Sequence, residues 1–289
     1  MGWLTDWIAN WFKGLLIGGI MGNLGNLFDS VNNQVGEIAT QVGQTPGAFN
    51  PGVFALIRNL SETVVLPVAG IILTFMATYE LIQLFIEKNN LHDVDMWIFF
   101  KWAFKTMIAV MILTNAWNIV MGVFDVSQYV VNSTAGLIGG STAISADMLA
   151  AFEASLWAMD VGPLLGLWLQ SFLIQIIVLI MNIVVFIIVY GRLIEIYLLT
   201  SVAPIPLATL TNREFGGMGQ NYLKSLCAIG FQGFLILVCV AIYAVLVQSI
   251  AISGDPIGAI WACIGYTVLL CFTMFKTGSL AKAVFGAHG

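Results

Sequence analysis

The sequence contains few charged residues. Only 9% of its 289 residues are Asp, Glu, Lys or Arg, whereas 60% are hydrophobic and the mean hydropathy is +0.96. A soluble globular domain carries about 25% charged residues. The ten basic residues stand singly or in pairs in a chain of net charge −5, so no basic patch for tight nucleic-acid binding is present in the sequence. This composition predicts a polytopic membrane protein.

Residues that carry chemistry are also sparse. The four cysteines lie in apolar runs without metal-ligand spacing, and the two histidines stand far apart, at positions 92 and 288. We therefore expect no disulfide framework and no metal site. The sequence has no recognisable Ser-His-Asp set and no phosphate-binding glycine loop, so we expect no enzyme activity and no intrinsic cofactor.

The N-terminal stretch MGWLTDWIANWFKGLLIGG lacks the basic region and the cleavage site of a signal peptide. Trp3, Trp7 and Trp11 recur at helical spacing with other apolar residues, which predicts an amphipathic helix. That helix either lies at the membrane interface, anchored by its tryptophans, or packs on the body of the protein. Glycines and polar residues from Gly18 onward predict an irregular external segment. Residues 1–60 are thus expected to form an N-terminal region separate from a membrane domain at 61–289.

Apolar runs long enough to cross about 30 Å of hydrocarbon predict about five membrane helices. They cover residues 64–86, 102–124, 164–191, 226–250 and 257–275. Lys88, Lys101 and Lys105 lie between or beside the first two runs, whereas the loop at 125–163 contains four acidic residues and no Lys or Arg. Because cytoplasmic loops are enriched in Lys and Arg, we expect loop 125–163 outside, the N-terminus outside and the C-terminus in the cytoplasm of a cell-membrane protein.

The segment 193–213 interrupts this pattern with Pro204 and Pro206. Each proline lacks an N–H, so the carbonyls of Thr200 and Val202 are expected to be free. The segment is then re-entrant or a cytoplasmic extension of the third helix, and its free carbonyls line a wet cavity or hold a neighbouring subunit. A simple helix stop before the fourth membrane helix is the other interpretation. Arg192 and Glu195, three residues apart, are expected to pair on one helix face.

The expected external loop has two halves. Residues 125–145 are small, polar and glycine-containing, and residues 146–160 have helical spacing of apolar residues. A flexible stretch followed by a helix fits pore lining or subunit docking, and a helix lying on the membrane surface fits equally well. The four acidic residues oppose strong DNA binding, so only weak contacts are expected, through the residues Gln128, Tyr129, Asn132 and Trp157.

Polar residues inside the apolar runs are expected to face protein or water, because lipid cannot satisfy them. Glu80, Asn182 and Gln232 are the main examples, and together with Arg192 and Glu195 they are candidates for contacts between helices. Lys101 and Lys105 are expected to extend toward the inner interface beside nearby tryptophans. These contacts favour a tight bundle or an oligomer.

The stretches SVAPIPLATL and TNREFGGMGQNYLKSLCAIGFQGFLI resemble the polytopic inner-membrane subunit of type IV secretion systems. That subunit is the TrbL-like conjugal transfer protein, equivalent to the sixth VirB-type component, and this sequence most resembles its short form on Gram-positive mobile elements. The resemblance is densest over residues 190–250. The residues that carry it include Ser201, Ala203, Pro204, Pro206, Asn212, Arg213 and Glu214.

The resemblance implies an all-α membrane subunit of a conjugative channel. Such a subunit oligomerises with its own kind, assembles with secretion ATPases and bitopic scaffold proteins, and makes transient contact with single-stranded DNA, notably through the external loop. A secondary transporter or ion channel with a substrate site at the broken helix remains an alternative. The sequence contains no second broken segment in a matching half, which disfavours that alternative.

Overall fold

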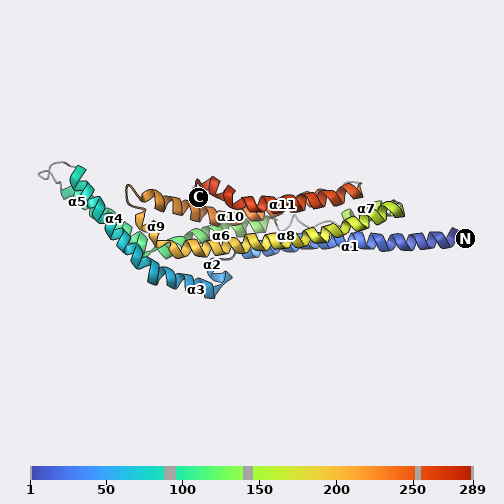
Figure 1. The fold of residues 1–289 in the computed structure, drawn as a ribbon, viewed down its shortest axis with the longest axis horizontal. Helices are drawn as coiled ribbons and strands as arrows, with labels where there is room; N and C mark the ends of the chain where they lie inside the picture. Colours follow the sequence, from blue (N-terminus) through green and yellow to red (C-terminus); the bar gives the residue numbers. More distant parts are fainter. Residues whose placement is uncertain (1, 88–95, 139–145, 251–254, 288–289) are drawn as a thin grey trace. The chain divides into compact units, whose positions relative to one another are not determined.

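A computed structural model describes residues 2–87, 96–138, 146–250 and 255–287 (Figure 1). These residues are helical apart from short turns and contain no strand, which confirms the prediction of an all-α membrane protein. The helices are α1 (Gly2–Val42), α2 (Pro46–Phe49), α3 (Pro51–Leu60), the π-helical turn η1 (Ser61–Val65), α4 (Leu66–Glu87), α5 (Met96–Thr114), α6 (Ala116–Ile138), α7 (Ala146–Trp157), α8 (Val161–Val202), α9 (Pro204–Thr209), α10 (Gly216–Ile250) and α11 (Pro256–Phe285).

Among the described residues, five helical stretches are long and apolar enough to cross a membrane. They are Pro51–Ile86, Met96–Thr114, Val161–Val202, Gly216–Ser249 and Pro256–Phe285. The expected number is confirmed, but the second expected stretch, 102–124, is wrong at both ends. Its helix begins at Met96 and ends at Thr114. At this end the carbonyl of Met111 accepts both from the side chain of Asn115 at 2.9 Å and from its backbone N–H at 3.2 Å.

The described chain divides into two compact units, and four helices, α6, α8, α10 and α11, have residues in both. The first unit consists of Met1–Gly43, Val131–Tyr190 and Phe234–Thr277, and the second consists of Gln44–Val130, Gly191–Gly233 and Gly278–Gly289. The first unit therefore contains α1, α7 and most of α8. The second contains α3, α4, α5 and α9, together with the end of α8 and the start of α10.

The expected irregular segment after Gly18 is wrong, because α1 continues without interruption to Val42. Its glycines permit packing here and do not break the helix. A Cβ atom added to Gly19 would lie 2.7 Å from Cδ1 of Trp168 in α8, so only glycine allows the indole to approach this closely. Glycine-rich sequence was mistaken for irregular backbone because its helix is stabilised by tertiary packing, which propensity does not include.

The first half of the expected external loop is also helical where the structure describes it. Helix α6 continues through Asp125 to Ile138, whereas residues 139–145 lie outside the described residues. The second half is the helix that its apolar spacing predicts, α7, in which Phe152 and Leu156 are buried. Because α6 contains Gln128, Tyr129 and Asn132, these residues lie on a helix and not in a flexible stretch.

Candidate functional site

The proline segment begins as an extension of α8, which has 42 residues and continues to Val202. At a rise of 1.5 Å per residue, a helix of this length is about 63 Å long, twice the thickness of a hydrocarbon core. The chain then turns at Ala203 and continues as α9. Pro204 occupies the first helical position of α9, where no hydrogen bond within α9 requires its missing N–H.

The expected free carbonyl at Thr200 is not free. The backbone N–H of Ala203 donates to it at 3.3 Å, and the N–H of Leu207 donates to the carbonyl of Ala203 at the same distance. The hydroxyl of Thr200 also donates to the carbonyl of Ile196 at 2.7 Å. Local hydrogen bonds of the tightened turn thus replace a bond that the prolines prevent.

Helix α9 packs against α4 and α5. Most of its six residues are buried, including Pro204 and Pro206. Small side chains make the contact close: Ala208 of α9 shares a buried cluster with Ala69 and Leu73 of α4 and with Ala109 and Leu113 of α5. In a membrane, such close packing of small residues is a main source of helix association.

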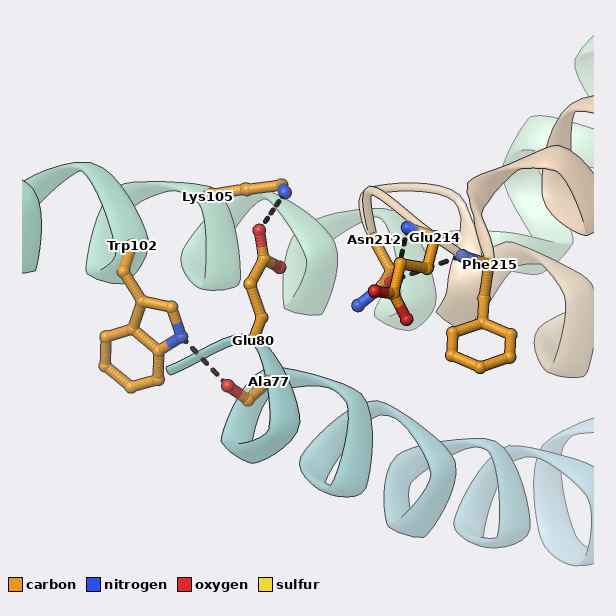
Figure 2. A network of polar contacts seen from close by, with 7 residues as sticks. All are labelled: Ala77, Glu80, Trp102, Lys105, Asn212, Glu214 and Phe215. Carbon is orange, nitrogen blue, oxygen red and sulfur yellow. Dashed lines mark hydrogen bonds and ion pairs between the residues drawn. The ribbon is translucent and has the colours of Figure 1, made fainter. Parts of the chain in front are cut away.

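A tight turn follows α9 and starts α10 (Figure 2). Oδ1 of the buried Asn212 accepts the backbone N–H groups of Glu214 at 2.9 Å and Phe215 at 3.0 Å, which satisfies donors at the start of the helix. The carboxylate of Glu214 also accepts from Nε2 of Gln83 in α4 at 2.7 Å. The turn is therefore fixed from within and tied to α4.

The charged pair of this site consists of Glu80 in α4 and Lys105 in α5. Figure 2 shows the carboxylate pointing at the ammonium group, with which it forms a salt bridge. Nearby, Nε1 of Trp102 donates to the carbonyl of Ala77 at 3.0 Å. Lys105 was expected to extend toward the interface, but it pairs with Glu80, 25 residues away in sequence. A pair inside an apolar helical hairpin fixes which faces of the two helices meet.

We expect neutralising one member, Glu80→Gln or Lys105→Met, to lower stability by about 1–3 kcal/mol, because the remaining charge loses its partner in a poorly solvated place. The exchanged pair, Glu80→Lys with Lys105→Glu, is expected to recover at least half of the loss. Thermal unfolding midpoints of the purified protein in detergent measure both effects. Single variants as stable as the original chain would show that the pair contributes nothing.

The end of α8 is joined to α10 by side chains that reach backbone carbonyls. Arg192 is only 6% exposed, and its Nε and Nη2 donate to the carbonyls of Ile229 and Gly230 at 2.9 and 3.1 Å. Tyr222 of α10 donates in return to the carbonyl of Leu199 at 3.0 Å. The expected pairing of Arg192 with Glu195 is therefore wrong.

Glu195 lies on another face of α8 and pairs with Lys282 of α11 at 3.6 Å. The i,i+3 spacing allowed a pair on one helix, but a fully surrounded guanidinium gains more from two carbonyl acceptors than from an exposed carboxylate. Sequence gave no signal for Tyr222 or Lys282 as partners, since each contact joins residues that are far apart in the chain.

The other expected site residues are not gathered in one place. Asn182 of α8 accepts from Gln34 of α1, and Gln232 lies against Gly278, where a Cβ atom would be 3.3 Å from its Nε2. Gln128 and Tyr129 belong to the second unit, whereas Asn132 and Trp157 belong to the first. Ser201, Arg213, Trp7 and Trp11 are partly or fully exposed, and the side chain of Trp3 lies outside the described part of the chain.

The contacts around α9 hold the neighbouring helices together and leave only a small cavity between them. The cavity that Glu80, Lys105, Thr211 and Asn212 help to line has a volume of about 10 Å³, room for about one water molecule. Among the described residues, no group of three or more His, Cys, Asp or Glu side chains could hold a metal ion. The proline segment thus lies where α4, α5, α8 and α10 are held together by α9 and by the contacts of Arg192 and Tyr222; we call this region the joint.

Comparison with known proteins gives one match. Residues 31–204 match the family described as TrbL/VirB6 plasmid conjugal transfer like protein. No curated protein and no solved structure matches the chain. The matched region includes Ser201, Ala203 and Pro204 but ends before Asn212, so it overlaps the region of expected densest resemblance, 190–250, only at its start. Because the match covers more than half of the chain, the protein belongs to the TrbL/VirB6 plasmid conjugal transfer like family.

Proposed function

We propose that this protein is a channel or scaffold subunit of a conjugative type IV secretion system. In this role it helps to pass single-stranded DNA, with its bound protein, across the cytoplasmic membrane. The observation that carries the proposal is the family match over residues 31–204, together with five helices, among the residues that the structure describes, that are long and apolar enough to cross a membrane. The subunit acts with copies of itself, with the secretion ATPases and with bitopic scaffold proteins, and it catalyses no reaction.

The physical properties of the chain suit a conduit better than a DNA-binding protein. Its net charge of −5 opposes strong attachment of phosphates, and a transferred strand must not be held tightly. Tyr129 is 75% exposed on α6, and Trp157 is also exposed. We assign weak contacts with the strand, or docking of another subunit, to Gln128, Tyr129, Asn132 and Trp157, and we place the N-terminus outside and the C-terminus in the cytoplasm.

The joint around α9 supports the proposal, because a machine that moves a polymer needs a framework that keeps its helices in place. The alternative, a transporter with a substrate site at the broken helix, requires a pocket of about 300–1,000 Å³. The cavity at that position has about 10 Å³. The small cavity therefore disfavours a transporter with its substrate site at the broken helix.

Deletion of the gene tests the proposal. Transfer of the mobile element to a recipient is expected to fall below detection and to return when the original chain is supplied from a second locus. Growth and the membrane levels of the other transfer proteins serve as controls. Transfer at the original frequency after deletion would overturn the proposed function.

A further inference from the structure

Helix α1 lies along α8 in a fixed register. Nδ2 of Asn23 donates to Oγ of Ser171 at 2.7 Å, and Nε2 of Gln34 donates to Oδ1 of Asn182; both pairs are separated by 148 residues in sequence. Two contacts with the same separation, eleven residues apart on each helix, require that the helices run parallel and rise together. Residue n of α1 therefore lies at the level of residue n+148 of α8.

This register places α1 at the depth of the membrane interior. The apolar stretch of α8 covers 164–191, and any window of about 20 residues within it includes 172–183. The corresponding residues of α1 are 24–35. The expectation of an interfacial helix thus conflicts with the packing along this part of α1, because a helix parallel to a membrane-crossing helix cannot lie in the plane of the interface.

The chain also returns along α1 before α8 begins. Oδ1 of Asn132 lies against Gly43 at the end of α1, and a Cβ atom on Gly14 would lie 3.7 Å from Cη2 of Trp157. Between Asn132 and Trp157 the chain therefore passes from the end of α1 back toward its start. If α1 and this return each cross the membrane, the termini keep the sides expected above. Asn132, beside the end of α1, then lies on the cytoplasmic side and the start of α5 lies outside, opposite to the sides expected for them.

One face of α1 is covered by the protein. Its buried residues recur every three or four positions, as in a helix packed along a neighbour, and include Leu16, Ile20, Leu24, Leu27, Val31, Gln34, Ile38 and Val42. Before Gly18 the opposite face exposes large apolar residues, such as Trp7, Trp11 and Leu15. From Gly18 to Thr40 the exposed face is polar or glycine: Gly18, Gly22, Asn26, Asp29, Asn33, Glu37 and Thr40.

Lipid cannot cover this exposed face. An Asp at the centre of a membrane helix costs about 2.5–3.5 kcal/mol, and Asp29 lies among residues 24–35 together with the amides of Asn26 and Asn33. A cavity of about 390 Å³ continues the polar surface between α1 and α8, lined by Asn33, Glu37 and Asn182, among others. Since about 10–15 Å³ holds one water, this cavity has room for many.

We propose that the exposed face of α1, marked by Asn26, Asp29, Asn33 and Glu37, lines a water-filled lumen enclosed by copies of this chain. One chain leaves the face open, and further copies around an axis would separate it from lipid. Direct contact between copies would bring like carboxylates together at low dielectric, which favours water in the centre. The use of this lumen by the transferred strand rests on the proposed function, and its acidic wall suits weak contact.

Thiol accessibility tests the proposal. Single cysteines are introduced at Asn33 and, as the matched control, at Ile183, which lies near the same level on α8 and is 51% exposed. The background replaces the four native cysteines, Cys227, Cys239, Cys263 and Cys271, by alanine. With a membrane-impermeant quaternary-ammonium methanethiosulfonate on whole cells, Asn33→Cys is expected to react at least tenfold faster than Ile183→Cys. Equal rates, whether both react or neither does, would overturn the lumen.

A double-cysteine variant distinguishes a lumen-lining α1 from an α1 that lies at the membrane interface, because the reagent would also reach an interfacial helix. Asn23→Cys with Ser171→Cys is expected to form a disulfide within one chain on mild oxidation, because the original side chains are in contact at 2.7 Å. Labelling at position 33 without this disulfide would contradict the packing of α1 on α8. A monomer in light scattering of the detergent-solubilised protein would contradict the enclosure by copies.

These results are independent of DNA transfer. If the cysteine variants label as expected, and a separate strain transfers normally after deletion of the gene, the lumen is retained and the proposed function is rejected. Loss of transfer on deletion without preferential labelling would reject the lumen and retain the function.

Discussion

Gly219→Ala is expected to destabilise the protein by about 1–3 kcal/mol and to reduce DNA transfer at least tenfold. A Cβ atom at this position would lie 2.6 Å from the carbonyl oxygen of Pro206 and 2.9 Å from Cα of Leu210. Both are backbone atoms of the proline segment, so relief requires movement of α9 away from α10. Because α9 is held between α4 and α5, that movement disturbs the whole joint.

Gly217→Ala is the matched control, since it lies in the same first turns of α10 and a Cβ there meets nothing within 4 Å. Alanine in a helix is favoured over glycine by up to about 1 kcal/mol, so this variant is expected to be as stable as the original or slightly more stable. The unfolding midpoint in detergent and the transfer frequency measure both variants. Equal behaviour of the two would show that the close contact of Gly219 is unimportant.

Arg192→Glu is expected to have the second large effect, a loss of about 3–5 kcal/mol that prevents stable insertion of the folded protein. The guanidinium is buried and faces the carbonyl oxygens of Ile229 and Gly230. A carboxylate there would place a negative charge against two negative ends of peptide dipoles, without water. Protein recovered in the membrane fraction, and its elution as a single species in detergent, measure the effect.

Arg192→Met distinguishes charge from volume. The two carbonyls lie inside the continuous helix α10, so they keep their helical partners when the guanidinium is removed. We expect the methionine variant to fold with nearly the original midpoint, since an apolar side chain of similar length can replace a buried ion at little cost. A methionine variant as unstable as the glutamate variant would mean that the two hydrogen bonds of Arg192 are themselves essential.

The sequence predicts the five most apolar membrane helices of the described residues because length and hydropathy identify segments that lipid can surround. Val161–Val202 and Pro256–Phe285 contain the expected runs 164–191 and 257–275. Helix α1 was missed beyond Gly18 for the opposite reason. Its stability comes from a buried stripe and from Trp168 against Gly19, and neither contact is encoded in local propensity.

The contacts between polar side chains could also be predicted only in part from the sequence. Glu80 was expected to need a protein partner, because a carboxylate in an apolar run must find one, but its partner Lys105 was not identified from sequence. For Arg192 and Glu195, local spacing suggested a pair that the tertiary structure does not form. Sequence indicates which polar groups require partners; the folded arrangement of distant helices determines which partners they find.

Photocrosslinking to the transferred strand tests the central claim most directly. A photoreactive residue replaces Tyr129, exposed on α6, and in the control it replaces Phe75, an exposed apolar residue of α4. Cells engaged in conjugation carry labelled DNA and either active or inactive transfer ATPases. We expect DNA adducts at position 129 only with active ATPases and none at position 75. Adducts to protein alone at position 129, under active transfer, would contradict passage of the strand along this subunit.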